Sequence, residues 1–398
     1  MLTRNSPDLI IVGAGVVGAA CAYYAARAGL TVTVIDRGPV AGGTTGSGEG
    51  NLLVSDKEPG PELELALLST VLWRELAGEL PSRIEYEAKG GLVVAAGEAG
   101  LAALRDFAAR QVRAGVTAEP VPGDRLAELE PHLAPGLAGG VHYPQDAQVQ
   151  PALAAAHLLR AAGDRVRLRL GEEVTALLTG ADGAVRGVRT PAGETYAPYV
   201  VNAAGTWGGE LARLAGVSLP VRPRRGFVLV TEPLPRVVRR KVYAADYVAD
   251  VASDSAALQT SAVVEGTPAG PVLIGASRER VGFDRSLSVE VLRRLAVQAV
   301  RLFPVLGTVR AMRTYAGFRP YLPDHLPAIG PDPRVPGLLH ACGHEGAGIG
   351  LAPATGLAVA SAVAGGEIPL DIKPFAPGRF DGGDGGDGGD GGDGGGSR

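Results

Sequence analysis

The N-terminal segment of the chain contains the pattern that most restricts its fold. Residues 8–12 (DLIIV) are apolar and have the length of a buried parallel strand, and GAGVVG follows at once at 13–18. An alanine-rich stretch of helical character then runs to Arg27, and Gly29 is placed to end it. Residues 31–36 (TVTVID) are mostly β-branched and predict a second strand. Strand, helix and strand in this order predict a βαβ unit, a parallel sheet and an α/β fold.

The glycines of GAGVVG have the spacing of a dinucleotide-binding turn. Gly13 permits the tight turn, Gly15 lets the backbone approach a pyrophosphate, and Gly18 allows close packing of helix on strand. Asp36 ends the second strand about 20 residues on, where a carboxylate accepts hydrogen bonds from ribose hydroxyls. Such a turn by itself also occurs for structural reasons. In this context it indicates a dinucleotide site, for either FAD or NAD.

Charge and cysteine content exclude several classes of protein. The net charge is −4, and residues 381–398 hold five Asp and one Arg, so the rest of the chain sums to zero. This balance argues against a nucleic-acid partner and against a polybasic membrane surface. Cys21 and Cys342 have no metal-like spacing, so we expect no metal site and no disulfide framework. A reduced, cytoplasmic location fits this composition.

Residues 9–26 are uncharged and raise the alternative of a signal peptide or a membrane helix. Asp8 precedes the run, and three glycines stand where a spanning helix would carry large apolar residues. We interpret the segment as strand, turn and buried helix, with a signal peptide as the minor alternative.

The rest of the chain predicts alternating helices and strands. Helices are expected at 62–80, 98–114, 150–162, 288–303 and 349–365, and strands at 92–95, 166–178, 183–196, 199–205, 227–232, 257–264, 271–277 and 338–343. The GGD repeat at 381–398 matches calcium-binding β-helix repeats only in composition, because it lacks the apolar residue that each turn would bury. We expect a disordered tail there.

Three further segments favour a flavin. Residues 37–51 (RGPVAGGTTGSGEGN) form a long loop of small residues that can follow a diphosphate and reach a ring beyond it. Residues 199–207 (YVVNAAGTW) end a strand in a small-residue turn. Residues 343–356 (GHEGAGIGLAPATG) form a second glycine-rich turn before a helix that begins near Ile349. The N-terminus of that helix would direct unsatisfied N–H groups and positive charge at a group lying before it.

Together with GFRPYLPDHLPAIG at 317–330, these segments resemble the D-amino-acid oxidase and glycine oxidase family of FAD-dependent flavoproteins. The family also includes sarcosine oxidases and hydrogen cyanide synthase subunits, and the resemblance covers residues 8–367. Within it, EGNLLVSDKEPGPEL at 49–63 is most similar to the flavin subunits of bacterial hydroxyproline or opine dehydrogenases.

The resemblance implies two domains. A Rossmann-like FAD-binding domain with a parallel sheet would comprise residues 1–80, 145–222 and 320–370. An α+β substrate-binding domain built on a mostly antiparallel sheet would comprise residues 81–144 and 223–319. FAD would lie with its pyrophosphate at the first glycine turn and its flavin ring at the second. The expected cofactor-binding residues are Gly13, Gly15, Val16, Val17, Gly18, Asp36, Arg37, Thr44, Thr45, Gly48, Gly50, Asn51, Val174, Ala204, Gly205, Trp207, Gly343, His344, Gly346, Ala347, Gly348 and Ile349.

Two residues are candidates for direct catalytic roles. Arg319 matches the arginine that pairs with the substrate carboxylate in glycine and D-amino-acid oxidases, and its planar fork suits that task. The implied reaction is hydride transfer from the substrate carbon to flavin N5, giving an imine that water hydrolyses. His344 matches the flavin-edge segment, and a catalytic and a structural role are equally supported at this point.

The chain departs from the family pattern at the substrate side. Sarcosine oxidases carry a flavin-bonded cysteine where this chain has Gly317, so we expect non-covalent FAD. Gln259 or Thr260 stands where glycine oxidase has a substrate-binding tyrosine. Replacements for that tyrosine could come from Tyr243, Tyr247 or Tyr315, and Arg225 could line the pocket or face solvent.

The resemblance implies oxidation of the C–N bond of a small amino or imino acid, such as D-proline, hydroxyproline, glycine or sarcosine. Alternatives are a flavoprotein that demethylates N-methyl amino acids and a scaffold subunit, with or without flavin, of a multi-subunit dehydrogenase. Electrons would pass to oxygen, a quinone or partner redox subunits, within a homo- or hetero-oligomer. A quinone-linked enzyme would lie at the inner membrane surface. The near-zero charge outside the tail argues against a tRNA-modifying relative.

Overall fold

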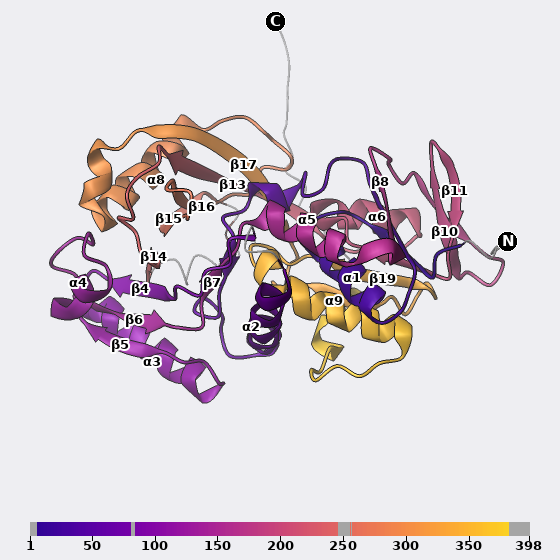
Figure 1. Cartoon of the computed structure of the whole chain (residues 1–398), viewed down its shortest axis with the longest axis horizontal. Helices are drawn as coiled ribbons and strands as arrows, with labels where there is room; N and C mark the ends of the chain where they lie inside the picture. Colours follow the sequence, from indigo (N-terminus) through magenta and orange to yellow (C-terminus); the bar gives the residue numbers. More distant parts are fainter. Residues whose placement is uncertain (1–5, 81–83, 246–254, 256, 382–398) are drawn as a thin grey trace, which may run out of the picture.

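The computed structural model describes residues 6–80, 84–245, 255 and 257–381. Two sheets organise this part of the chain. Figure 1 shows an eight-stranded sheet with its helices on the left and a six-stranded sheet with its helices on the right. Tyr247 and residues 382–398 of the expected tail lie outside the described residues.

The six-stranded sheet contains the predicted βαβ unit. Its strand order is β18-β19-β12-β1-β2-β8, and the pairs from β19 to β8 are parallel, whereas β18 pairs antiparallel with β19. Its strands are β1 (Leu9–Val12), β2 (Val32–Asp36), β8 (Val166–Leu170), β12 (Tyr199–Asn202), β18 (Ala328–Pro331) and β19 (Leu338–Cys342). The parallel sheet and the α/β fold class are therefore confirmed.

Helices α1 (Val16–Arg27), α5 (Pro151–Ala161) and α9 (Gly348–Ala364) belong to this half of the molecule, together with α2 (Pro61–Glu79) and the short α6 (Gly208–Leu214). Helices α1 and α9 touch along their backbones. A Cβ at Gly356 would lie 2.6 Å from the carbonyl carbon of Ala20, so glycine is required for this approach. This packing fixes the positions of the N-termini of α1 and α9 relative to each other.

The eight-stranded sheet is mostly antiparallel, as predicted. Its order is β17-β13-β16-β15-β14-β4-β6-β5, and the described pair that runs parallel is β14 with β4. Its strands are β4 (Gly91–Ala95), β5 (Glu119–Pro122), β6 (Gly139–Tyr143), β13 (Arg222–Thr231), β14 (Lys241–Ala244), β15 (Gln259–Gly266), β16 (Val272–Arg278) and β17 (Ala311–Tyr321). Helices α3 (Glu98–Arg113), α4 (Leu126–Leu129) and α8 (Val289–Leu302) accompany it.

Two small sheets complete the described fold. One contains β9 (Ala176–Thr179), β10 (Val185–Thr190) and β11 (Gly193–Tyr196), and the other pairs β3 (Asn51–Leu52) with β7 (Ala147–Gln148). The prediction of one strand over 166–178 is wrong. Gly171 has a φ of +74°, a left-handed conformation that breaks the strand, and β8 and β9 belong to different sheets.

The strands of each large sheet come from different parts of the sequence. Strands of the six-stranded sheet lie within 1–80, 145–222 and 320–370, while those of the eight-stranded sheet lie within 81–144 and 223–319 apart from residues at the ends of β13 and β17. The domain limits themselves stay a prediction.

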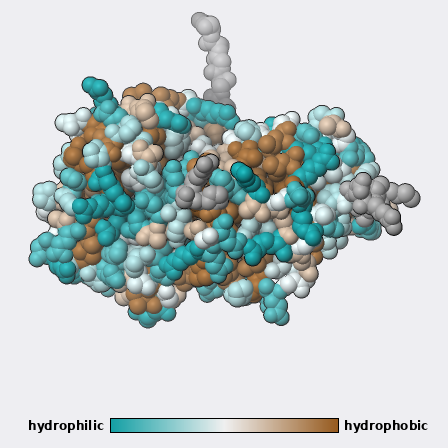
Figure 2. All heavy atoms as spheres, in the orientation of Figure 1, coloured by the Kyte–Doolittle hydropathy of each residue, from teal (hydrophilic) through white to brown (hydrophobic). Residues whose placement is uncertain are grey.

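No helix in the described part of the chain is long and apolar enough to cross a membrane. Residues 9–26 form β1, a turn and most of α1, and this segment is largely buried. On the face drawn in Figure 2, hydrophobic residues form separate patches among hydrophilic ones.

Candidate functional site

One large cavity lies where the two halves of the molecule meet. Its volume is about 670 Å³, within the range of about 300–1,000 Å³ common for ligand sites. The turn after β1, the loop 37–51, the segment 203–211, strands β13 and β17 and the start of α9 all contribute to its lining. Segments from both ends of the sequence therefore share one cavity.

The first glycine turn forms one end of this cavity. Gly13 has a φ of +120°, and a Cβ there would overlap the backbone of Ala203. At Gly18 a Cβ would overlap the carbonyl oxygen of Gly13. Gly15 caps α1 without a side-chain hydrogen bond. The helix thus begins with N–H groups directed at the cavity and with backbone segments packed too closely for side chains.

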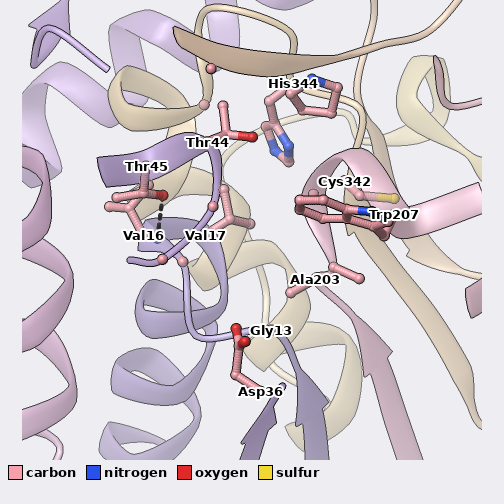
Figure 3. Close-up of a pocket in the computed structure, with 18 of the residues that line it drawn as sticks. Gly13, Val16, Val17, Asp36, Thr44, Thr45, Ala203, Trp207, Cys342 and His344 are labelled. Carbon is pink, nitrogen blue, oxygen red and sulfur yellow. Dashed lines mark hydrogen bonds between the residues drawn. The ribbon is translucent and has the colours of Figure 1, made fainter. Parts of the chain in front are cut away.

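Thr45 and Asp36 fix the edges of this turn. The Val16 N–H donates to Oγ1 of Thr45 at 3.0 Å, the bond dashed in Figure 3. Asp36 accepts from the N–H groups of Ala14 and Gly38, each at 2.7 Å. A carboxylate offers about four lone-pair sites, so Asp36 retains acceptor capacity toward a ribose hydroxyl. The two backbone bonds were not foreseen, and they hold the carboxylate at the cavity edge.

The second glycine turn forms the opposite end. Gly346, Gly348 and Ile349 line the cavity, and α9 begins at Gly348 with no side-chain cap from Ala347. Two helix N-termini whose N-cap residues supply no side-chain cap, Gly15 of α1 and Ala347 of α9, therefore face a single cavity. In Figure 3, Gly13 and Asp36 lie at one end of this space, and Thr44 and His344 lie toward the other.

His344 is buried, with 3 % of its surface exposed, and lines this second end. Its Nε2 lies 3.0 Å from Oγ1 of Thr355, and the Thr355 hydroxyl donates to the carbonyl of Leu351 at 2.9 Å. Because the threonine has one hydroxyl hydrogen, His344 Nε2 is the donor in the first bond. Burial lowers the pKa of His344 from 6.5 to about 3, so the ring is neutral at physiological pH.

This neutral histidine gives a pH-dependent stability. Its folded-state pKa is depressed, so the unfolded chain takes up the proton first, and stability is lost as pH falls below 6.5 toward 3. As pH falls from 6.5 to 5, the unfolding free energy of His344→Gln is expected to rise by about 1.7 kcal/mol relative to that of wild type. Denaturant unfolding at both pH values, with the same saturating FAD, measures this difference.

Asp146 provides a comparison of opposite sign. Burial raises its pKa from 3.8 to about 7, although the hydroxyl of Ser55 and the N–H of Val54 donate to it. Its stabilising contribution is present below pH 3.8 and is lost as pH rises through 7. Asp146→Asn should therefore lose stability relative to wild type as pH falls from 6.5 to 5. The same slope in both variants would contradict this account of His344.

Arg319 lies on β17, inside a strand that the sequence analysis did not predict. It lines the cavity, and its Nη1 donates to the carbonyl of Ser277 at 2.8 Å. A Cβ at Gly226 would overlap Nη1, so the guanidinium lies flat against β13. Its Nε is 3.4 Å from where a Cβ of Gly346 would be, which brings Arg319 to the second glycine turn. The cation and the α9 N-terminus thus share one end of the cavity.

Most of the predicted site residues line this cavity, namely Gly13, Gly15, Val16, Val17, Asp36, Arg37, Thr44, Thr45, Gly48, Gly50, Asn51, Val174, Ala204, Gly205, Trp207, Arg319, His344, Gly346, Gly348 and Ile349. Gly18, Gly343 and Ala347 do not line it. Gly18 packs on Gly13, Gly343 has a φ of +83° against Leu322, and Ala347 caps α9 from outside the cavity lining. That these three residues bind the cofactor stays a prediction.

Several residues that were expected at the substrate side have other structural roles. Gln259 accepts from Arg224 at 2.8 Å, and Thr260 accepts from Gln298, so neither lines the cavity. Arg225 neither lines the cavity nor faces solvent, because it is buried and pairs with Glu279 and Asp284.

The two described tyrosines are also engaged elsewhere. Tyr243 shares a hydrogen bond with Ser55, and Tyr315 donates to the carbonyl of Gly48 at 3.3 Å. Val174 lines the cavity but lies between β8 and β9 rather than on a strand. Neither Tyr243 nor Tyr315 lines the cavity.

Two lining features were missed. Arg37 stacks over Trp207 with 4.4 Å from guanidinium to ring centroid, and Phe283 stacks on the same indole at 5.4 Å. Glu49 also lines the cavity and is 8 % exposed. The signal for it was a single acid between glycines (GEG) in a loop of small residues whose other charged residue is Arg37.

Comparison with known proteins identifies the family of this chain. A family model of FAD dependent oxidoreductases, DAO, matches residues 8–362. The chain belongs to this family. It is 32% identical to the HcnC subunit of hydrogen cyanide synthase from Pseudomonas aeruginosa, over 94% of this chain and 96% of that protein. It is also 32% identical to glycine oxidase of Geobacillus kaustophilus, over 93% and 96% of the two chains.

Solved structures of the family share the fold. The crystal structure of the Geobacillus kaustophilus glycine oxidase has a TM-score of 0.84 and 29% identity, covering 93% of this chain and 98% of that one. Iminodiacetate oxidase from Chelativorans sp. BNC1 gives a TM-score of 0.81 and 25% identity, with coverage of 93% and 98%. The architecture of a DAO-family FAD-dependent oxidoreductase is thereby established for this chain.

The cavity residues fit FAD. The N-termini of α1 and α9, whose N-cap residues supply no side-chain acceptor, suit groups that carry negative charge, and Asp36 is held for a ribose. Oδ1 of Asn51 is buried without a hydrogen-bond partner among the described residues, so an acceptor is available along the loop. The described residues contain no group of three or more metal-ligating side chains.

We expect the flavin to be released by acid precipitation, because no reactive nucleophile is present at the predicted position. Gly317 lines the cavity in place of a cysteine. Cys342 also lines it, but burial raises the pKa of this thiol to about 12, so it stays protonated. Absorbance of the supernatant and of the washed pellet measures the release. Flavin that remains with the pellet would contradict non-covalent binding.

Proposed function

We propose that this chain uses FAD to oxidise the C–N bond of a small amino or imino acid. The observation that carries the proposal is the position of Arg319. It lines the same cavity as the N-termini of α1 and α9, at the α9 end, where an arginine can hold a carboxylate. A carboxylate held there is fixed relative to whatever group the second glycine turn binds.

In this proposal the chain divides the cavity between cofactor and substrate. Asp36 and the start of α1 would hold the ribose and pyrophosphate, and the loop 44–51 would run along the cofactor toward the start of α9. When bound, FAD supplies a two-electron acceptor for hydride from the substrate carbon. The α9 N-terminus would stabilise negative charge that develops at its end of the cavity.

The substrate side is proposed to lie against the eight-stranded sheet. Gly226, Val228 and Gly317 line the cavity from β13 and β17. The absence of a side chain at Gly226 makes room for the Arg319 guanidinium, and at Gly317 it makes room for Ser47. Arg319 would orient the substrate carbon by gripping the carboxylate, which is the main gain from positioning. The names of the relatives, glycine oxidase and iminodiacetate oxidase, support a small carboxylate-bearing amine as substrate.

Partner subunits are a further part of the proposal. HcnC, which is similar over nearly the whole chain, is named as a subunit of hydrogen cyanide synthase. This similarity supports a chain that passes electrons to a partner redox subunit, and oxygen or a quinone are the other acceptors to be tested.

Steady-state turnover tests this function. Purified FAD-loaded protein should reduce an artificial redox dye with at least one of glycine, sarcosine, D-proline and cis-4-hydroxy-D-proline, and a carbonyl product should form in equal amount. Oxygen consumption without dye would identify an oxidase, and dye reduction without it a dehydrogenase. Absence of turnover with all four amino acids would count against the proposed substrate class.

A further inference from the structure

The cavity lining holds a buried acid, Glu49, that the proposed function does not yet use. Glu49 is 8 % exposed and lines the cavity together with Arg319. Its Oε1 has no hydrogen-bond partner among the described residues, and the side-chain amide of Asn51 donates to Oε2 at 3.5 Å. A buried carboxylate oxygen without a donor is costly to stability, so this acid needs a partner that a ligand can supply.

Strand β16 brings Glu49 close to Arg319. Arg319 donates to the carbonyl of Ser277, and a Cβ at Gly275 would lie 2.7 Å from Cδ and 2.8 Å from Oε2 of Glu49. Glu49 and Arg319 therefore both lie against β16, at Gly275 and Ser277, and both line the cavity.

Charges around Glu49 leave it without a cation of its own. Lys241 donates to Glu265 at 3.2 Å, and Lys89 lies 3.4 Å from Glu87. In the described ranges no lysine or arginine forms an ion pair with Glu49. Glu265 is a second buried carboxylate whose pKa is raised by burial and, to a smaller extent, by the charge of Glu49.

We propose that Glu49 binds the amino group of the substrate as a cation while Arg319 binds the carboxylate. The inference rests on the proposed function and narrows it to amino and imino acids whose nitrogen is basic. Once bound, the substrate N–H bond breaks, the proton joins the Glu49 carboxylate, and the electron pair stays on nitrogen for the oxidation. Amides and N-acyl amino acids, which carry no cation, would be poor ligands.

The test compares an amine with an isosteric ether. FAD-loaded wild type, Glu49→Gln and Glu49→Asp are assayed for kcat/KM with glycine, sarcosine and D-proline. Methoxyacetate has the shape of sarcosine with an ether oxygen in place of the charged nitrogen, and its inhibition constant is measured on the same proteins. Glu75→Gln, which removes an exposed acid from α2, is the control for loss of one charge and should behave as wild type.

Glu49→Gln is expected to lower kcat/KM for each oxidised amino acid about 10- to 100-fold, because a hydrogen bond between charged groups is lost. Methoxyacetate should inhibit it as it inhibits wild type, flavin content should stay the same, and Glu49→Asp should keep more activity than Glu49→Gln. If the Gln variant does not fold, the Asp variant decides, with weaker amine turnover and unchanged methoxyacetate inhibition as the supporting result.

Three results would overturn the inference. These are an unchanged kcat/KM, an equal loss of methoxyacetate binding, and loss of flavin, which would assign Glu49 to the cofactor. Failure of wild type to oxidise any of the amino acids is a different result, because it removes the proposed function and the inference with it.

Discussion

Replacing Arg319 with alanine is expected to raise the KM for the amino-acid substrate about 100-fold or more while the protein retains its flavin. Two charge-assisted hydrogen bonds to a carboxylate are lost, each worth about 1.5–3 kcal/mol. The flavin should remain because the N-termini of α1 and α9 and the loop 44–51 are unchanged. Steady-state kinetics and the flavin absorbance of the purified variant measure both quantities.

Arg319→Lys separates charge from geometry. Lysine keeps the positive charge but lacks the planar fork, so its KM should fall between those of wild type and the alanine variant. If the alanine variant oxidises amino acids with the same kinetic constants as wild type, Arg319 does not belong to the substrate site.

Gly18→Ala is expected to prevent assembly of the cofactor site altogether. A Cβ at this position would overlap the carbonyl oxygen of Gly13. Neither the Gly13 carbonyl nor the Gly18 backbone that carries the Cβ can move without displacing β1 or α1. We expect a loss of more than about 3 kcal/mol in unfolding free energy and purification without flavin. Thermal unfolding and the ratio of flavin to protein absorbance measure these effects.

Gly78→Ala is the matched control. Gly78 lies in α2, and a Cβ there meets no atom within 4 Å. Alanine favours a helix more than glycine by about 1 kcal/mol, so this variant should be at least as stable as wild type and keep its flavin. A Gly18→Ala protein as stable as the control would contradict the packing described for the first glycine turn.

The cofactor end of the site could be predicted because its signals are local. The strand, turn, helix and acid of residues 8–36 follow one another in sequence, and each has a distinct physical requirement. The second glycine turn was predicted for the same reason, since a glycine-rich turn before a long apolar helix is visible in the sequence. Gly18 packs against the backbone of Gly13, as its place in the turn predicted, and Gly343 packs against the side chain of Leu322.

The substrate end could not be predicted because its contacts are non-local. Arg319, flanked by Gly317 and Pro320, was assigned by resemblance with no strand predicted around it, whereas it lies on β17 and pairs in register with Arg224 of β13. The strand survives these residues because it is the edge strand of its sheet, where proline is tolerated. Arg225 and Gln259 were considered for the pocket, and their ion-pair and hydrogen-bond partners become visible only in three dimensions.

The most direct test of the account is an anaerobic absorbance spectrum of the purified protein, titrated with D-proline, cis-4-hydroxy-D-proline, sarcosine and glycine. We predict an oxidised flavin spectrum that bleaches with at least one of these amino acids. A flavin spectrum that none of them bleaches would contradict the proposed substrate class. A colourless protein that cannot be reconstituted with FAD would contradict the central claim that this cavity holds a flavin and would favour a scaffold subunit.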